Sequence, residues 1–154
     1  MGLKSYSQLR EEFRRAGVNI EEVPESEPFR FGPGRSCWSS FAAIVIADII
    51  DDKGKRHTVV IRISILDRKF PFLMGRPVLK ALSMIPDVEQ CKLILRKRGA
   101  QADMPETSSG HSSLMLQIPA KEALSDLSTS TAFINCKTGL TEGAYLHDDI
   151  HVPF

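Results

Sequence analysis

Residues 38–66 read WSSFAAIVIADIIDDKGKRHTVVIRISIL, and this stretch decides the fold. Two segments rich in β-branched and aromatic residues flank the polar residues 51–55, whose composition is typical of a turn. Within residues 57–66, valine or isoleucine occupies every second position from Val59 to Ile65, which is the period of a strand with one buried face. We therefore expect two long strands joined by a tight turn, and a mainly β fold.

An amphipathic helix is expected before these strands. Ser5 and Gln8 have the spacing of a capping box, and the apolar residues of this segment recur at helical intervals: Tyr6, Leu9, Phe13 and Ala16. Gly17 is a typical C-terminal stop. The pattern predicts a helix over residues 5–16, followed by a polar connection over 21–27 that prolines keep from being helical.

A glycine-rich turn lies between that connection and the long strands. Residues 29–34 read FRFGPG, in which two phenylalanines alternate with arginine before a Gly-Pro-Gly turn sequence. This pattern predicts a hairpin with its tip at residues 31–34. The aromatic residues of the strand that follows, Trp38 and Phe41, are expected to pack in the core or across strands.

Shorter elements are expected after the long strands. Residues 70–75, FPFLMG, form an apolar run that contains a proline, and Pro77 at a first-turn position opens a short helix over 78–84. Further strands are predicted over 88–95 and, more briefly, over 114–118.

The composition suits one globular domain with a tail. The chain has 154 residues and a net charge of +1 at pH 7, which is divided unevenly. Residues 1–100 carry 18 basic and 12 acidic side chains, whereas residues 101–154 carry 2 and 7. Serine, threonine and acidic residues replace the periodic apolar pattern near the C-terminus, which is typical of a flexible chain. We expect one domain over residues 1–119 and a flexible acidic tail over 120–154.

Several classes of protein are disfavoured by the composition. The longest apolar run is interrupted by Asp48 and is too short to span a membrane, and the N-terminus has no signal-peptide pattern, so a cytoplasmic protein is expected. Basic residues are scattered apart from a cluster at 96–98, which argues against nucleic-acid binding. Cys37, Cys91 and Cys136 are odd in number and far apart, so neither a disulfide framework nor a zinc knuckle is predicted.

The histidines offer further hypotheses. His147 and His151 are four residues apart and could share a helix face that binds zinc, but nothing there predicts a rigid helix, so no metal site is expected. His57 stands at a turn and is expected to be exposed to solvent. No Ser or Cys nucleophile is tied by spacing to His111, so no catalytic triad is predicted.

The order of these elements resembles the retropepsin-like aspartic peptidase domain of retrotransposon polyproteins. The resemblance rests on FRFGPG at 29–34, FPFLMGRPVL at 70–79 and Gly110-His111, and it covers residues 5–119. It implies a small, partly open β-barrel or sandwich with one N-terminal helix and one short helix after the apolar-Gly segment.

The resemblance also implies roles for two segments. A flap-like hairpin would be formed by Phe31, Gly32, Pro33 and Gly34, although a plain surface hairpin is the alternative. A second segment, Leu73, Met74 and Gly75, would support the catalytic loop from behind.

The chain departs from this family at the catalytic loop itself. Aspartic peptidases activate water between two carboxylates, each presented by an Asp-Thr-Gly or Asp-Ser-Gly loop. Neither tripeptide occurs in the sequence, and the first aspartate is Asp48, well after the helix that the loop should precede. We therefore expect no catalytic residue and no cofactor in this chain.

Three functions are compatible with the sequence. The first is a retrotransposon-derived, catalytically inactive peptidase-like domain that at most binds a peptide or a partner, a second copy included, through its cleft and exposed strand edges. The second is a fragment of an active aspartic endopeptidase whose catalytic loop is encoded upstream. The third is an unrelated small β interaction domain.

Overall fold

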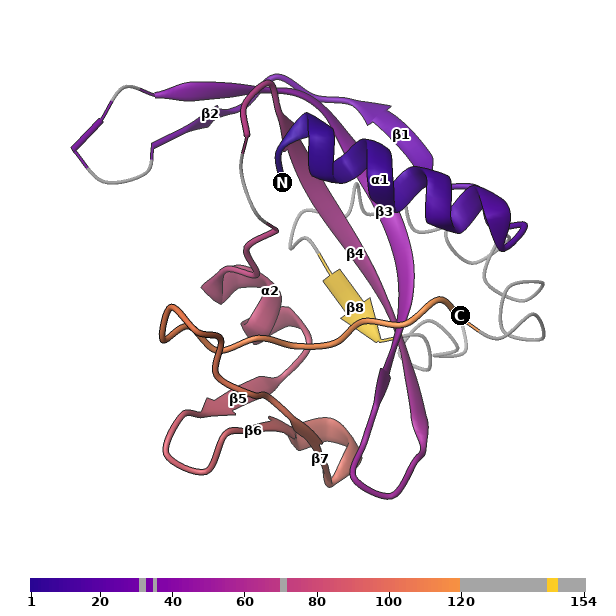
Figure 1. The fold of residues 1–154 in the computed structure, drawn as a ribbon, viewed down its shortest axis with the longest axis vertical. Coiled ribbons are helices and arrows are strands. Elements are labelled where there is room, and N and C mark those ends of the chain that lie inside the picture. The colour runs from indigo at the N-terminus through magenta and orange to yellow at the C-terminus, as the bar shows by residue number, and fades with distance from the viewer. Residues whose placement is uncertain (31–32, 35, 70–71, 120–143, 147–154) are drawn as a thin grey trace, which may run out of the picture. The chain divides into compact units, whose positions relative to one another are not determined.

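A computed structural model describes residues 1–30, 33–34, 36–69, 72–119 and 144–146 (Figure 1). The described chain is mainly β, as predicted, and its helices are α1 (Leu3–Arg15), α2 (Arg76–Ala81) and the 3-10 turn η1 (Arg96–Arg98). Its strands are β1 (Glu21–Pro24), β2 (Pro28–Phe29), β3 (Cys37–Ile50), β4 (Arg56–Leu66), β5 (Met84–Asp87), β6 (Lys92–Leu95), β7 (Ala100–Asp103) and β8 (Ala144–Leu146).

These strands form two sheets, and the chain divides into two compact units. The larger sheet has the order β1-β3-β4-β8, with β2 also paired to β3, and the smaller sheet has the order β5-β6-β7. The first unit comprises Met1–Val45 and Ile61–Met74, and the second comprises Ile46–Val60 and Gly75–Phe154. The hairpin of β3 and β4 therefore contributes its open end to the first unit and its turn to the second.

The long hairpin of β3 and β4 forms as the sequence predicts. Its turn is closed by hydrogen bonds from the Asp51 amide to the Lys55 carbonyl, 2.9 Å, and from the Gly54 amide to the Asp51 carbonyl, 3.0 Å. Gly54 has φ = +78°, a left-handed conformation that glycine adopts without strain. Consecutive residues are buried at 42–45 in β3 and at 59–61 in β4, so both faces of the hairpin are covered there.

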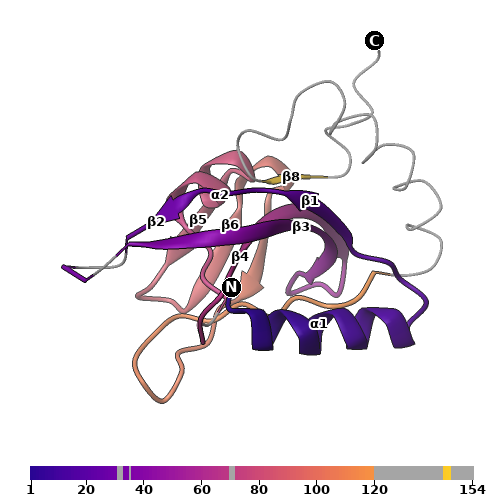
Figure 2. The ribbon, with the colours of Figure 1, turned by 90° about the horizontal axis from the view of Figure 1, so that it is seen from above.

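In the first unit, one face of α1 packs against the sheet (Figure 2). Tyr6 and Phe13 are buried, as the helical spacing predicts. The Tyr6 ring meets the Phe41 ring edge to face, with the ring centroids 5.3 Å apart. The Tyr6 hydroxyl donates a 2.6 Å hydrogen bond to the Glu22 carboxylate, so α1 is attached to both β3 and β1.

The start of α1 differs from the predicted capping box. Gly2 is the N-cap residue and Ser5 lies inside the helix. The Met1 amino group donates to the Ser64 carbonyl, and the Leu66 amide donates to the Met1 carbonyl, so β4 fixes the chain just before the helix. This strand-like contact, rather than a capping side chain, sets where the helix begins.

The end of α1 agrees with the prediction. Gly17 has φ = +78°, the Val18 amide donates to the Phe13 carbonyl, and the Gly17 amide donates to the Arg14 carbonyl. This pair of bonds is a Schellman motif, which usually includes an apolar contact across the helix end. Phe13 and Val18, the residues at those two positions, are both buried.

The polar connection predicted over 21–27 contains a strand. β1 pairs antiparallel with β3, with Glu21 opposite Ile44 and Pro24 opposite Phe41. Most side chains of β1 are exposed, so the strand has no apolar alternation that the sequence could show. Pro24, which lacks an amide donor, is tolerated because β1 ends the strand order of its sheet.

In the second unit, the strand predicted over 88–95 is wrong in its first half. β5 and β6 form an antiparallel hairpin, with Asp87 opposite Lys92, and the turn between them contains the exposed Val88 and Cys91 at φ = +52°. The apolar Val88 is thus a turn residue. β7, which the sequence pattern does not predict, pairs with the other side of β6.

The helix predicted over 78–84 is shorter in the structure. α2 follows the N-cap Gly75 and has Pro77 in its first turn, as expected, but it ends at Ala81. The reason is local: Ser83 adopts φ = +52°, and the next residue enters β5.

The strand predicted over 114–118 is reduced to one bridge. Gln117 and Asp48 exchange two backbone hydrogen bonds, of 2.8 and 2.9 Å, and the neighbouring residues of 114–118 have no strand assignment. Gln117 therefore lies beside β3 without extending the sheet as a strand.

Most of the predicted tail lies outside the described residues, which stop at 119 and resume at 144–146. The strand β8 lies within this segment and pairs with β4. The domain boundary at 119 and the flexibility of the rest stay predictions.

The packing of α1 generates a stability test. Phe13 is 3% exposed, so we expect Phe13→Ala to destabilise the chain by about 3–5 kcal/mol in urea unfolding, because it leaves a cavity under the helix. The matched control is Leu3→Ala on the same helix, where the side chain is 41% exposed and the expected change is about 0.5 kcal/mol. Equal losses in the two variants would contradict this packing.

Candidate functional site

The hairpin predicted to resemble a flap is formed by β2 and β3. Pro28 lies opposite Trp38, and Phe29 lies opposite Cys37. Of the predicted tip, Pro33 and Gly34 form an exposed turn, whereas Phe31 and Gly32 lie outside the described residues. The hairpin is thus present, and its arms position the residues around Trp38.

From the sequence, Trp38 is expected to pack in the core or across strands, and the structure excludes the core, although the residue lies opposite Pro28 of β2. Its side chain is 59% exposed, whereas the other aromatic residue of this strand, Phe41, packs against Tyr6. Along β3, Trp38 and Ser40 point to an exposed face while Ser39 between them is buried. The two residues of β2 pair only with the edge of β3, so they leave the face that carries Trp38 open.

The predicted loop-supporting segment is also open to solvent at one position. Leu73 is 58% exposed and Met74 is half-buried, and both belong to the first unit. Gly75 serves as the N-cap of α2. The role of this segment as a support for a catalytic loop stays a prediction.

A partly buried ion pair lies beside the base of the hairpin. Glu25 Oε2 accepts hydrogen bonds from Arg62 Nη2 at 3.0 Å and Nε at 3.2 Å, and the Glu25 side chain is only 7% exposed. Burial raises the pKa of Glu25, but the hydroxyls of Ser64 and Ser39 and the Arg62 guanidinium outweigh it, so the pKa lies below its ordinary value. In the sequence, Glu25 is one of several glutamates in a polar segment, so no pattern could have identified it as the partner of Arg62.

In the second unit, the expectation that His57 is exposed is wrong. His57 is buried, and its Nε2 lies 2.8 Å from Asp51 Oδ2, while Asp51 Oδ1 accepts the amides of Lys53 and Lys55 at 2.9 Å. The hydrogen bond with His57, together with the two amides, holds the pKa of Asp51 below its ordinary value. A turn-closing aspartate thus draws the histidine inward.

Asp48 is a second buried carboxylate in this unit. Its Oδ1 accepts the Thr58 hydroxyl at 2.6 Å, and its Oδ2 accepts Arg56 Nη1 at 3.0 Å. An acidic residue inside an apolar strand segment is the sequence signal for such a pair. Both partners lie on the adjacent strand, so the carboxylate is compensated within the hairpin.

Two carboxylates converge on Lys92. Its Nζ lies 2.6 Å from Asp103 Oδ1 and 2.9 Å from Asp52 Oδ2, and these contacts raise the pKa of Lys92. Both aspartates are exposed, and a cation lies between them. This geometry differs from a peptidase dyad, in which two desolvated carboxylates share one proton.

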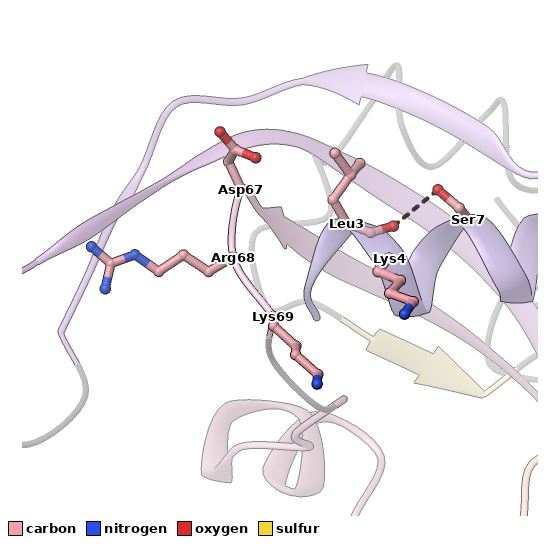
Figure 3. A pocket seen from close by; sticks show the side chains of 6 residues that line it. All are labelled: Leu3, Lys4, Ser7, Asp67, Arg68 and Lys69. Atoms are coloured by element: carbon pink, nitrogen blue, oxygen red, sulfur yellow. Dashed lines mark hydrogen bonds between the residues drawn. The ribbon is translucent and has the colours of Figure 1, made fainter.

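A shallow, open depression of about 450 Å³ lies at the start of α1 (Figure 3). Its lining residues are Leu3, Lys4, Ser7, Asp67, Arg68 and Lys69. The Ser7 hydroxyl donates to the Leu3 carbonyl, so it is occupied within the helix. None of the lining side chains is buried.

The described residues contain no group of three or more His, Cys, Asp or Glu side chains that could hold a metal ion. His111 is exposed. His147 and His151, the histidines considered above as zinc ligands, lie outside the described residues. None of the helices in the described part of the chain combines the length and apolar character needed to cross a membrane.

Comparison of the chain with protein-family models, with curated protein sequences and with solved structures finds no match.

The Asp51–His57 pair generates a pH-dependent prediction. Because the folded-state pKa of Asp51 is lowered, the pair contributes stability above the unfolded aspartate pKa, about 3.9, and loses it as the pH falls through the folded value. We expect Asp51→Asn to lower the free energy of unfolding at pH 7, and this difference from the original chain to shrink in acid. The exposed Asp67→Asn is the control. The same loss in both variants at every pH would refute the assignment.

Proposed function

We propose that this chain is a non-catalytic, retropepsin-like domain derived from a retrotransposon polyprotein, and that it binds extended polypeptides at the hairpin of β2 and β3. The observation that carries the proposal is Trp38, a large aromatic side chain that is 59% exposed on an arm of this hairpin. Exposed tryptophans are frequent anchors of protein interfaces because they bury much apolar area with few rotatable bonds.

The order of elements supports the same proposal. The helix α1, which packs on the sheet, precedes the hairpin of β2 and the long strand β3, a second long strand β4 follows, and the apolar-Gly segment then leads into the short helix α2. Leu73 in that segment, a residue with a predicted site role, is a further exposed apolar residue of the first unit.

The absence of a catalytic loop argues for binding without cleavage. Peptide hydrolysis needs one group to take a proton from water and another to protonate the leaving amine. The chain has no Asp-Thr-Gly or Asp-Ser-Gly sequence. In the described residues, the buried carboxylates Glu25, Asp48 and Asp51 are each paired with a basic side chain rather than with each other.

A fragment of an active aspartic endopeptidase is the second candidate. The parallel bridge between Gly2 and Leu66 favours it, because a segment encoded before Met1 could continue beside β4. Sequencing of the upstream coding region separates the candidates: an in-frame Asp-Thr-Gly or Asp-Ser-Gly shortly before α1 would support the fragment.

The first test of the proposed function is proteolysis. We expect no turnover of unfolded casein by the purified chain between acidic and neutral pH, because the sequence has no Asp-Thr-Gly or Asp-Ser-Gly loop to present the carboxylates that activate water. Cleavage is followed by release of labelled fragments, with a mock preparation as the control for contaminating proteases. Turnover that a hydroxyl-containing transition-state analogue inhibits, and that the mock preparation lacks, would overturn the non-catalytic assignment.

The second test is binding. We expect the fluorescence anisotropy of labelled unfolded casein to rise when the chain is added. Trp38→Ser is expected to raise the dissociation constant about tenfold or more, as loss of an aromatic anchor does. Val88→Ser is the matched control, because it removes another exposed apolar side chain in the second unit. Light scattering of the chain alone shows whether a second copy occupies the same surface. The proposal fails if Trp38→Ser changes neither casein binding nor self-association.

A further inference from the structure

The strand register changes by one residue at the base of the Trp38 hairpin. Pro24 of β1 lies opposite Phe41, and Pro28 of β2 lies opposite Trp38. Between these two pairs, the chain advances four residues from Pro24 to Pro28, whereas β3 spans only three residues from Trp38 to Phe41. One extra residue in an antiparallel pair is a β-bulge, which bends the strand and changes its direction. Residues 25–27 form this bulge and set the direction in which β2 leaves the sheet.

Two groups of contacts hold the bulge. The Ser39 amide donates to the Glu27 carbonyl, and the Glu27 amide donates to Ser39 Oγ, both at 2.9 Å. At the other end of the bulge, Glu25 reaches across to Arg62 of β4 through two hydrogen bonds on Oε2. The bulge is thus attached to β3 by its backbone and to β4 by a side chain.

The Glu25–Arg62 pair is a costly way to stabilise a sheet. Desolvation of two charges offsets most of their attraction, and well-packed apolar residues at such sites are often as stable or more stable. The second oxygen, Glu25 Oε1, is buried and lacks a hydrogen-bond partner of good geometry in the described residues. An ion pair does fix the relative orientation of the two strands, because its hydrogen bonds are satisfied in only one arrangement of them.

We propose that Glu25 and Arg62 are positioning residues that hold the bulge, and with it the hairpin that carries Trp38, in one orientation. The inference deepens the proposed function and rests on it for one consequence only, namely that a fixed hairpin presents Trp38 to a partner at a lower entropic cost. The positioning itself is measurable without any partner.

The experiment compares the full chain with Glu25→Gln and Arg62→Gln. Two readouts report on the hairpin: hydrogen exchange of the Glu27 and Ser39 amides, and the fluorescence anisotropy of Trp38, the single tryptophan of the chain. We expect faster exchange at these amides and a loss of Trp38 anisotropy, with exchange at residues 42–45 of β3 unchanged. Glu11→Gln is the matched control, since it breaks an exposed ion pair with Arg14 on α1 in the same unit.

Both readouts unchanged in folded Glu25→Gln and Arg62→Gln would overturn the inference. If the single variants lose protection throughout the unit, the double variant Glu25→Met/Arg62→Met decides, because it removes the pair without leaving a buried charge. A folded double variant with loss of protection only at the hairpin supports the inference. Retained hairpin protection, or failure of this variant to fold, contradicts it.

Casein binding separates this inference from the proposed function. Altered exchange in Glu25→Gln with no casein binding by the original chain would leave the positioning role intact and refute the binding function. Unaltered exchange with casein binding that depends on Trp38 would do the reverse.

Discussion

The pairing of β3 with β4 is the constraint on which the rest of the structure depends. Both strands are long, and each has an outer edge whose amides and carbonyls need partners. On β3, β1 and β2 take this edge, and Gln117 binds at Asp48. On β4, Met1 and β8 do so. Most other elements in the described chain are therefore attached to this hairpin directly or through one neighbour.

Three carboxylates that are buried on or beside the hairpin of β3 and β4 are each paired with a basic side chain. The Asp51–His57 pair closes the turn, Asp48 bridges to the adjacent strand, and Arg62 holds Glu25 at the bulge. A buried charge without its partner would cost far more than these pairs contribute. Such pairs tolerate one register between strands, so they add specificity to a hairpin whose apolar residues alone would accept several.

The proposed binding function uses the parts of the hairpin that this pairing leaves open. At the open end of the hairpin of β3 and β4, β2 pairs with the edge of β3 but covers neither face of the strand. Trp38 is therefore exposed. A peptidase-like scaffold without the loop that brings the carboxylates would keep such a hairpin and lose the chemistry. Binding of extended chains and their cleavage are thus separable, because the first needs apolar and backbone contacts and the second needs a pair of titratable groups.

The sequence by itself determined the elements whose signal is local and periodic. Alternating isoleucines predicted β4, helical spacing of Tyr6 and Phe13 predicted α1, and Gly17 and the polar residues 51–55 predicted a helix end and a turn. In the structure Gly17 and Gly54 adopt left-handed conformations at these two places. Elements with exposed or mixed side chains, such as β1 and β7, carried no such signal and exist because a neighbouring strand offers hydrogen bonds.

The tertiary structure alone decided which polar residues are buried and which aromatic residue is exposed. His57 and Glu25 belong to polar segments, and only the folded chain brings them to Asp51 and Arg62. Tryptophan is a residue type expected in a core, but among the described residues no element covers the face of β3 that carries Trp38. The physical reason is that burial depends on what lies across a strand's face, and that neighbour is distant in the sequence.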